Sequence, residues 1–230
     1  MTNIRAYRTL LALGLLAAGA AFPLHGQVVP LDDAIFVLYR QDTVVGDEHV
    51  TLHRMGLGQA ARIIGQSEVR MRDGTEMRPR VEASPEMRPT TYQNKFTGAE
   101  AGEVMLSRSG RRLVARTQTA TGESQREFRI SDRTVILEPQ VVLLYYLLRP
   151  WTETPDTEIT ALDPRTGAQQ SLMVRVVGTE RLRMGRVTVE AQRIRLEGGD
   201  QVTEVWFDEE GRVLRVEIPA VGFRAERKGN

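Results

Sequence analysis

Apolar and polar residues alternate with a period of two along most of the chain, which is the pattern of β-strands with one buried face. Turn sequences rich in Gly, Asp and Pro separate these segments at intervals of roughly eight to twelve residues. Consecutive hairpins of this kind predict an all-β, mainly antiparallel protein, with a curved meander sheet that is barrel-like or a sandwich. The predicted strands are Ala34–Tyr39, Val44–His53, Arg62–Met71, Thr91–Phe96, Glu103–Ser109, Arg111–Thr119, Glu127–Ile130, Thr134–Leu137, Asp156–Leu162, Gln169–Val177, Val187–Leu196, Gln201–Phe207 and Arg212–Ile218.

The last predicted hairpin places two aromatic residues on opposite faces of one strand. Trp206 and Phe207 are adjacent, so their side chains point in opposite directions. In the strand that follows, strict alternation puts Leu214 on the same face as Val216 and opposite to Val213.

Residues 75–91 depart from the alternation because they are rich in proline and charge. The tetrapeptide Glu76-Met77-Arg78-Pro79 recurs as Glu86-Met87-Arg88-Pro89. The prolines disfavour a central strand, so the sequence favours a surface loop that contains a duplication. If the segment is extended instead, Met77 and Met87 lie on the same side and offer a soft apolar contact to a ligand.

A second departure is the segment Val141–Leu148, in which every residue is apolar. Pro139 precedes it and Pro150 follows it, and prolines at the first helical position and just beyond the last are typical of a helix. The residue before a proline is disfavoured in the α region, so we expect one short helix near residues 139–149 that ends before Pro150. The alternative is a strand buried on both faces, which periodicity alone does not distinguish.

The two sides of this helix predict a binding site. Val141, Leu144, Tyr145 and Leu148 follow the spacing of one helical stripe, which we expect to pack on the sheet. The other side then lines the opening of the curved sheet and contacts an apolar ligand, with the Tyr146 hydroxyl at a polar rim. The alternative is a filled core in which the helix leaves no room for a ligand. The predicted ligand-binding residues are Val142, Leu143, Tyr146 and Leu147.

Residues 1–26 have the three parts of a cleavable signal peptide: a basic start with Arg5 and Arg8, an apolar stretch Leu10–Phe22 and a short polar end. We expect cleavage close to Gln27, and Ala18-Gly19-Ala20 is an alternative recognition sequence. The apolar stretch is shorter than the ~20 residues that span a bilayer, so we expect no stable membrane span after cleavage.

The remaining residues 27–230 are predicted to form a single β-rich domain, and two lobes joined near residues 138–155 are the alternative. The chain has no cysteine that could accept a lipid anchor. We therefore predict a periplasmic or secreted protein, and its stability must come from buried apolar surface instead of disulfides.

The charge of the predicted mature chain argues against nucleic acid as a partner. The full chain has 31 basic and 30 acidic residues, and residues 1–26 contain two arginines and no acid, which leaves 29 against 30 and a net charge of −1. Domains that bind nucleic acid are usually strongly basic.

The sequence predicts no catalytic residues, no metal site and no cofactor. His49 and His53 share a predicted strand face but lie about 13 Å apart, at ~3.3 Å per residue, which is too far to bind one metal ion together. Asp32-Asp33 and Asp208-Glu209-Glu210 fall at strand ends or in turns, where solvated carboxylates are common. We interpret these residues as structural.

Several short motifs, taken in order along the chain, resemble a group of uncharacterised exported bacterial β-rich proteins known as domains of unknown function. The motifs are Phe36–Tyr39, Val44-Val45-Gly46, Leu143–Arg149, Val176–Glu180 before Met184-Gly185, and Glu204–Arg215. The resemblance covers most of the chain after residue 26, and it implies a fold more than a function, because the motifs are structural. In outline the chain is also similar to curved-sheet periplasmic lipoprotein carriers, an analogy of shape alone.

These observations lead to the hypothesis of a non-enzymatic periplasmic or secreted protein that binds an apolar or amphipathic envelope ligand such as a lipid. One alternative is a structural or assembly partner of a cell-envelope protein, which would pair through an exposed strand edge. Another is a hydrolase that acts on envelope polymer through turn carboxylates, with Asp208 and Glu209 as candidates.

Overall fold

The computed structural model describes residues 28–98, 101–154, 156–199 and 201–229. The predicted signal peptide, residues 1–26, lies outside this range. Within the described residues, no helix has the length and apolar character that crossing a membrane requires.

One 15-stranded sheet contains all the strands of the described chain, in the order β8-β7-β6-β5-β4-β3-β2-β1-β15-β14-β13-β12-β11-β10-β9. Neighbouring strands are antiparallel, except β9 and β10, which are parallel. The predicted all-β, mainly antiparallel class is therefore confirmed. The strands are β1 (Val28–Arg40), β2 (Thr43–Met55), β3 (Arg62–Met71), β4 (Glu76–Ala83), β5 (Pro89–Phe96), β6 (Gly102–Ser109), β7 (Arg112–Thr119), β8 (Gly122–Arg129), β9 (Thr134–Ile136), β10 (Thr157–Leu162), β11 (Gln169–Met184), β12 (Val187–Gly198), β13 (Gln201–Phe207), β14 (Val213–Ile218) and β15 (Phe223–Arg227).

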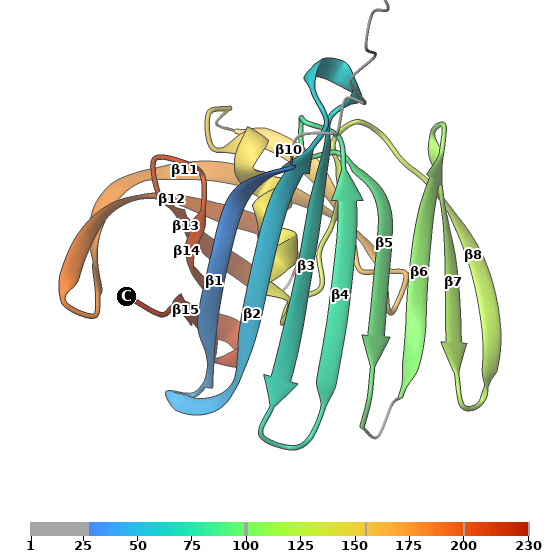
Figure 1. Ribbon diagram of the computed structural model, residues 1–230, viewed down its shortest axis with the longest axis horizontal. Coiled ribbons are helices and arrows are strands. Elements are labelled where there is room, and N and C mark those ends of the chain that lie inside the picture. Colours follow the sequence, from blue (N-terminus) through green and yellow to red (C-terminus); the bar gives the residue numbers. More distant parts are fainter. Residues whose placement is uncertain (1–27, 99–100, 155, 200, 230) are drawn as a thin grey trace, which may run out of the picture.

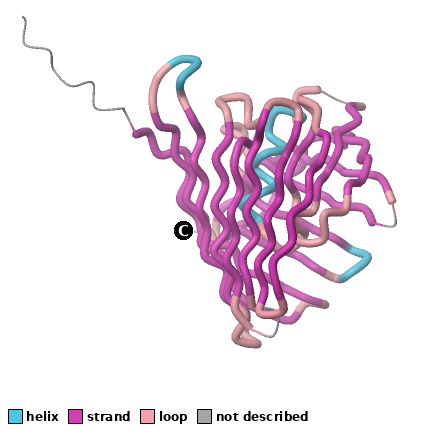
Figure 2. Tube along the Cα trace, turned by 90° about the vertical axis from the view of Figure 1, so that its right-hand side faces the viewer, coloured by secondary structure: helices cyan, strands magenta, loops and turns pink. Residues whose placement is uncertain are grey.

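The sheet curls so that its two ends face each other. Strands β1–β8 form one curved wall, and the C-terminal strands form a second wall behind it (Figure 1). The helix η2 (Val142–Trp151) lies between the walls, as the view from the side also shows (Figure 2). Two short 3₁₀ turns, η1 (Gly58–Ala60) and η3 (Pro219–Val221), lie in connections between strands.

The two edge strands of the sheet, β8 and β9, are not joined by a ladder, but a turn from the second wall reaches β8. Arg126 Nη1 on β8 donates a hydrogen bond to the Thr166 carbonyl at 2.7 Å. Gly167 lies so close to Phe128 that an added Cβ would be 2.9 Å from the ring. The β10–β11 turn therefore packs against β8, the edge strand of the first wall, and this contact makes the open sheet barrel-like.

The surface loop predicted for residues 75–91 is wrong, because Glu76–Ala83 forms the central strand β4. In the β3–β4 ladder, Gln66 pairs with Arg80 and the next pair is Val69 with Met77. No described pair lies between these two. Pro79 lies in this interval, so its missing N–H costs no ladder bond there. Met77 and Met87 are both buried, but Met87 lies in the turn after β4, with a φ of 59°, and not on the same strand.

The apolar segment is helical, as predicted, but η2 is a 3₁₀ helix and continues through Pro150 to Trp151. In a 3₁₀ helix each N–H bonds to the carbonyl three residues earlier. The Thr152 N–H donates to the Arg149 carbonyl at 3.2 Å, so the last turn spans Pro150 without needing its missing N–H. The predicted end before Pro150 is therefore wrong.

The main core lies between the walls and has η2 at its centre. The helix contacts β2, β3, β9 and β14. Every residue of Val141–Leu148 is buried, and none is more than 2% exposed. Gly65 on β3 makes room for the helix, because a Cβ added there would lie only 2.6 Å from Leu143 Cδ1. The close approach of helix and sheet thus depends on a missing side chain.

Trp206 and Phe207 lie on opposite faces of β13, as predicted. Phe207 belongs to the main core, and Trp206 to a small second cluster that includes Leu214. The face predicted for Leu214 is wrong, because a register shift between Trp206 and Phe207 inserts an extra residue into β14. As a result Val213 and Val216 both face the main core, whereas Leu214 does not.

Candidate functional site

A groove opens beside η2 on the inner face of strands β4–β7. It consists of two adjoining cavities of about 800 Å³ and about 660 Å³, called here the first and second cavity. Met77, Phe96, Gln140 and Arg165 line both cavities and form a waist between them. Binding sites for small molecules usually enclose about 300–1,000 Å³, so each cavity has the size of a ligand site.

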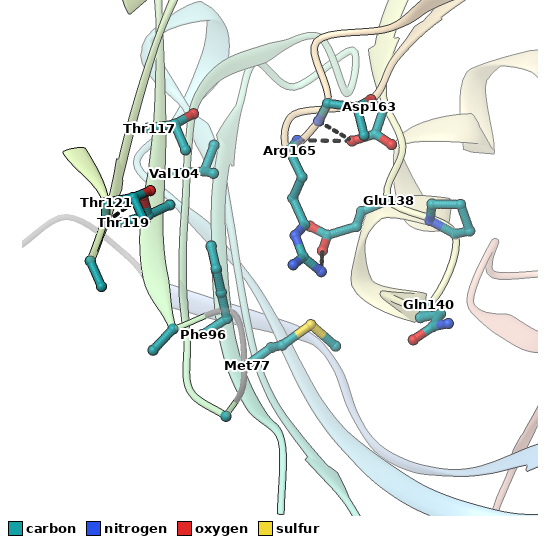
Figure 3. Close-up of a pocket in the computed structure, with 15 residues that line it drawn as sticks. Met77, Phe96, Val104, Thr117, Thr119, Thr121, Glu138, Gln140, Asp163 and Arg165 are labelled. Carbon is teal, nitrogen blue, oxygen red and sulfur yellow. Dashed lines mark hydrogen bonds and ion pairs between the residues drawn. The ribbon is translucent and has the colours of Figure 1, made fainter. Parts of the chain in front are cut away.

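The sheet and two loops form opposite walls of the first cavity. The sheet contributes Met77 from β4, Phe96 from β5, Val104 from β6 and Thr117 from β7. The other wall is the segment 138–140, just before η2, together with the turn 163–166. In Figure 3 the labelled side chains of the two walls lie on opposite sides of an open space. Strand alternation explains the apolar sheet wall, since every second residue of each strand faces inward.

The second cavity lies where the β1–β2 and β3–β4 turns meet at one end of the sheet. Its apolar lining includes Val44, Val45 and Met71, together with Met77 and Phe96 of the waist. Arg40 and Arg72, at its rim, are both exposed. The groove therefore runs from a charged rim, past the waist, into the first cavity.

Glu138 provides a buried carboxylate in the first cavity. Its Oε2 accepts hydrogen bonds from the Tyr92 hydroxyl at 2.8 Å and from Asn94 Nδ2 at 3.1 Å, and its Oε1 lies 3.8 Å from Arg165 Nη1. Burial raises the pKa of Glu138, and the hydrogen bonds from Tyr92 and Asn94 oppose the rise. Asn94 is fully buried, and its Oδ1 has no partner among the described residues. Two side chains of β5 thus fix the position of the carboxylate.

A side-chain contact and a backbone hydrogen bond hold Arg165 at the waist. Its guanidinium lies over the Phe96 ring, 4.6 Å from the centroid, which is the geometry of a cation–π contact. Asp163 Oδ1 accepts the backbone N–H groups of Arg165 at 2.8 Å and Thr166 at 3.1 Å, and thereby fixes the turn (Figure 3). The waist is therefore a defined feature of the fold.

The four residues predicted to contact a ligand lie beside the groove and do not line it. Val142, Leu143, Tyr146 and Leu147 are at most 2% exposed. Their predicted position at the opening of the sheet is wrong, because β9 and β14 cover the side of η2 that β2 and β3 leave free. Whether any of the four contacts a ligand stays a prediction.

Buried polar groups anchor η2 in this covered position. Glu48 Oε2 accepts the Val142 N–H at 2.7 Å, and Glu48 Oε1 accepts the Leu143 N–H at 3.0 Å and the Ser67 hydroxyl at 2.7 Å. These bonds satisfy two of the donors that the first turn of a helix leaves unpaired. Burial raises the pKa of Glu48 to about 7, against the opposing effect of these hydrogen bonds.

The hydroxyl of Tyr146 donates to Asp32 Oδ2 at 2.5 Å, inside the core and not at a rim. Asp32 also accepts two hydrogen bonds from Arg227, at 2.5 and 2.8 Å, in a bidentate ion pair. Asp32, interpreted from the sequence as a solvated carboxylate at a strand end, is buried. It connects the first strand, the last strand and η2.

The other sequence candidates have structural partners. His49 Nε2 lies 2.7 Å from Asp33 Oδ1 on the exposed face of β2. Asp208 accepts the backbone N–H of Arg212 at 2.8 Å and its Nε at 2.6 Å, which closes the β13–β14 turn. Across the part of the chain that the structure describes, no group of three or more His, Asp or Glu residues is placed to hold a metal ion.

Most residues of the groove are not predicted from the sequence. Met77 is a partial exception, since the sequence offers it as a soft apolar contact only under the alternative in which residues 75–91 are extended. Glu138 and Arg165 lie in turn-like sequence, and nothing local indicates that Glu138 meets Tyr92 or that Arg165 meets Phe96. The one available signal is the position of Glu138, next to a buried apolar run where an acid needs partners.

Comparison with solved structures finds a match of the whole fold. A crystal structure from Brucella abortus, described as a beta-barrel-like protein of domain of unknown function DUF1849, has a TM-score of 0.50 and 11% sequence identity. The match covers 88% of this chain and 96% of that chain. At this identity the likeness supports the fold alone. No curated protein matches the chain.

Comparison with protein families gives a match over residues 36–228, to a family described as "Domain of unknown function (DUF6134)". The match begins at Phe36, inside β1, and ends one residue after β15, so it includes the last part of β1, all the later strands and η2. It agrees with the resemblance to β-rich domains of unknown function. The chain therefore belongs to the DUF6134 family.

Proposed function

We propose that the protein is an exported, non-enzymatic binding protein that holds an apolar or amphipathic molecule, such as a lipid, in the groove. The observation that carries the proposal is the pair of adjoining cavities with a shared waist. Together they form an elongated space with an apolar sheet wall, which suits a molecule with an extended apolar part.

The chemistry of the sheet wall supports this function. Met77 is unbranched and polarisable, so it adapts to ligands of different shape. Phe96 and Val104 supply rigid apolar surface from neighbouring strands. These side chains project from a hydrogen-bonded sheet, so the site is formed before a ligand arrives, which lowers the entropic cost of binding.

The two alternative functions have weaker support. An assembly partner would need an accessible strand edge, but β8 carries Glu123, Arg126, Glu127 and Arg129, and such charges oppose edge pairing. A hydrolase acting through Asp208 and Glu209 would need a free Asp208 carboxylate, whereas Arg212 binds both oxygens of this carboxylate.

A substitution that fills the first cavity tests the proposal. The neutral probe N-phenylnaphthylamine should gain fluorescence on binding the wild-type protein. Thr117→Trp places an indole in the cavity and should abolish most of this gain. Gln118→Trp is the matched control, because the neighbouring residue is exposed on the outer face of β7 and should leave binding unchanged. If the wild type binds no probe, or if both variants bind it fully, the groove is not the binding site.

Export is tested separately by cell fractionation and mass spectrometry of the recovered chain. We expect a soluble periplasmic or secreted form that begins close to Gln27. An intact Met1 form confined to the cytoplasm would contradict this part of the proposal.

A further inference from the structure

The two cavities of the groove differ in charge. The residues that line the second cavity include three arginines, Arg40, Arg72 and Arg165, and one acid, Asp73. The first cavity is lined by two acids, Glu138 and Asp163, and by Arg165. The charged side chains thus sum to +2 in the second cavity and −1 in the first. An anionic group is therefore attracted to the second cavity and disfavoured in the first.

The fold itself brings the two rim arginines together. Arg40 ends β1 and Arg72 follows β3, and both strands run in the same direction on either side of β2. Their ends therefore lie at the same edge of the wall. The Arg72 N–H donates to the Val45 carbonyl at 2.7 Å, which holds the β3–β4 turn against the start of β2. The spacing of the two arginines is set by sheet pairing and not by chance loop positions.

The charged residues that line the second cavity differ in whether they already have partners within the protein. Asp73 Oδ1 accepts the Thr75 backbone N–H at 2.9 Å, so this carboxylate stabilises the β3–β4 turn. Arg165 is engaged at the waist by Phe96 and Glu138. Among the described residues, no carboxylate forms an ion pair with Arg40 or Arg72, and hydrogen bonds from Thr75 lower the pKa of Asp73 with only a further contribution from the Arg40 charge. Both side chains can therefore turn toward a ligand at the rim.

Given the proposed role of the groove in binding, on which this inference rests, we propose that its ligand is an amphiphile with an anionic head group, a carboxylate or a phosphate. The head lies at the rim of the second cavity between Arg40 and Arg72. The apolar chain passes the waist at Met77 and Phe96 and occupies the first cavity. Arginine suits both head groups, because its planar guanidinium donates two parallel hydrogen bonds to carboxylate or phosphate oxygens.

Matched fluorescent probes test the head group. The probes are dansyl-undecanoic acid, its uncharged methyl ester, and a dansyl-labelled alkyl phosphate of similar length, each titrated at neutral pH and low ionic strength. We expect the wild type to bind at least one anionic probe more tightly than the ester. The stronger of the two anionic probes then identifies the head group, carboxylate or phosphate. Added salt should weaken the anionic probes and spare the ester.

The variant Arg40→Gln/Arg72→Gln removes both rim charges and keeps two hydrogen-bonding side chains. We expect it to bind the preferred anionic probe about tenfold more weakly and the ester as well as the wild type does, since two exposed charge contacts contribute on the order of one factor of ten. The control is Arg78→Gln/Arg80→Gln, which removes the same charge from exposed positions of β4 on the outer face. It should bind every probe as the wild type does.

The outcomes separate the two proposals. If the wild type binds the ester and the acids equally, and the rim variant changes nothing, the groove binds apolar molecules but the anionic head group is wrong. If the control weakens the anionic probe as much as the rim variant does, only the net charge of the protein matters, and the rim site is again wrong. If the wild type binds none of the probes, the proposed function itself fails.

Discussion

The inner face of the sheet has a filled middle and an open end, and the two regions differ in how their polar groups are used. In the middle, η2 covers β2 and β3, and the carboxylates of Glu48 and Asp32 are bound by the helix itself. At the open end none of the described helices packs extensively on β4–β7, and Glu138 and Arg165 face a cavity. The buried acids of the middle therefore hold the helix, whereas the buried carboxylate of Glu138 lies at the wall of a cavity.

The difference has a simple origin in chain length. The apolar run Val141–Leu148 ends after eight residues, and η2 rises by about 2 Å per residue as a 3₁₀ helix, so it spans only part of a sheet of fifteen strands. The inner face that it does not reach still carries inward apolar residues such as Met77 and Val104. These two side chains line the first cavity.

The largest effect on stability is expected from breaking the Asp32–Arg227 ion pair, which connects η2 to β1 and β15. Asp32→Ala leaves Arg227 with a half-buried, unpaired charge and the Tyr146 hydroxyl without its acceptor. We expect the free energy of unfolding to fall by about 3–5 kcal/mol. Urea denaturation measures it, with the exposed neighbour Asp33→Ala as control, which should change stability by less than about 0.5 kcal/mol. Equal effects in the two variants would mean that the Asp32 pair does not hold the filled middle together.

The next largest effect concerns the sides of η2. Both sides are buried, so Leu143→Gln and Leu144→Ala should each lower stability by about 2–5 kcal/mol, the first by burying an amide and the second by leaving a cavity. Thr117→Val, in the wall of the open groove, should change it by less than about 0.5 kcal/mol. Thermal and urea unfolding compare the three. A stable Leu143→Gln protein would show that this side of the helix is open, as the sequence alone suggests.

The fold is predicted from the sequence where it depends on local patterns, and less well where it depends on neighbouring strands. Strand alternation and turn residues predict the antiparallel sheet, and the apolar run between two prolines predicts a helix, because both are local patterns. Pro79 inside a central strand and Leu214 in a bulge are missed, because each depends on the register of a neighbouring strand. Alternation assumes an uninterrupted ladder, and the sequence does not show where the ladder breaks.

The candidate site is predicted less well than the fold for the same reason. The groove joins Met77, Phe96, Glu138 and Arg165, which come from four segments that only the curled sheet brings together. The sequence places the ligand on η2 because an apolar helix side needs a cover, but it does not reveal that β9 and β14 provide one. Gly65 likewise carries no sequence signal for the helix that packs on it.

A smaller effect is expected from filling the space above Gly65. Gly65→Ala brings a methyl group within 2.6 Å of Leu143 Cδ1 and should destabilise the protein by about 1–3 kcal/mol. In the background of Leu143→Ala, which removes the clashing atoms, the same change should cost much less. A double-mutant cycle from urea denaturation measures this coupling. Additive effects would mean that Gly65 is not the point of close contact between β3 and η2.

The last expected effect is the pH dependence that Glu48 gives to the filled middle, which accumulates gradually over several pH units. Burial raises the pKa of Glu48 to about 7 in the folded protein, above the value of about 4.3 expected for the unfolded chain. Between these values the folded state retains a proton that the unfolded state has lost. The stabilisation is therefore complete below about pH 4.3 and is lost as the pH rises through about 7, with a slope of at most ~1.4 kcal/mol per pH unit for one proton. Glu138, whose pKa burial also raises, acts in the same direction. Urea denaturation across this range should show a flatter slope for Glu48→Gln, whereas Glu68→Gln, at a half-exposed carboxylate of β3, keeps the wild-type slope. If Glu48→Gln leaves the slope unchanged and Glu138→Gln removes it, the titrating carboxylate lies in the open groove and not under the helix.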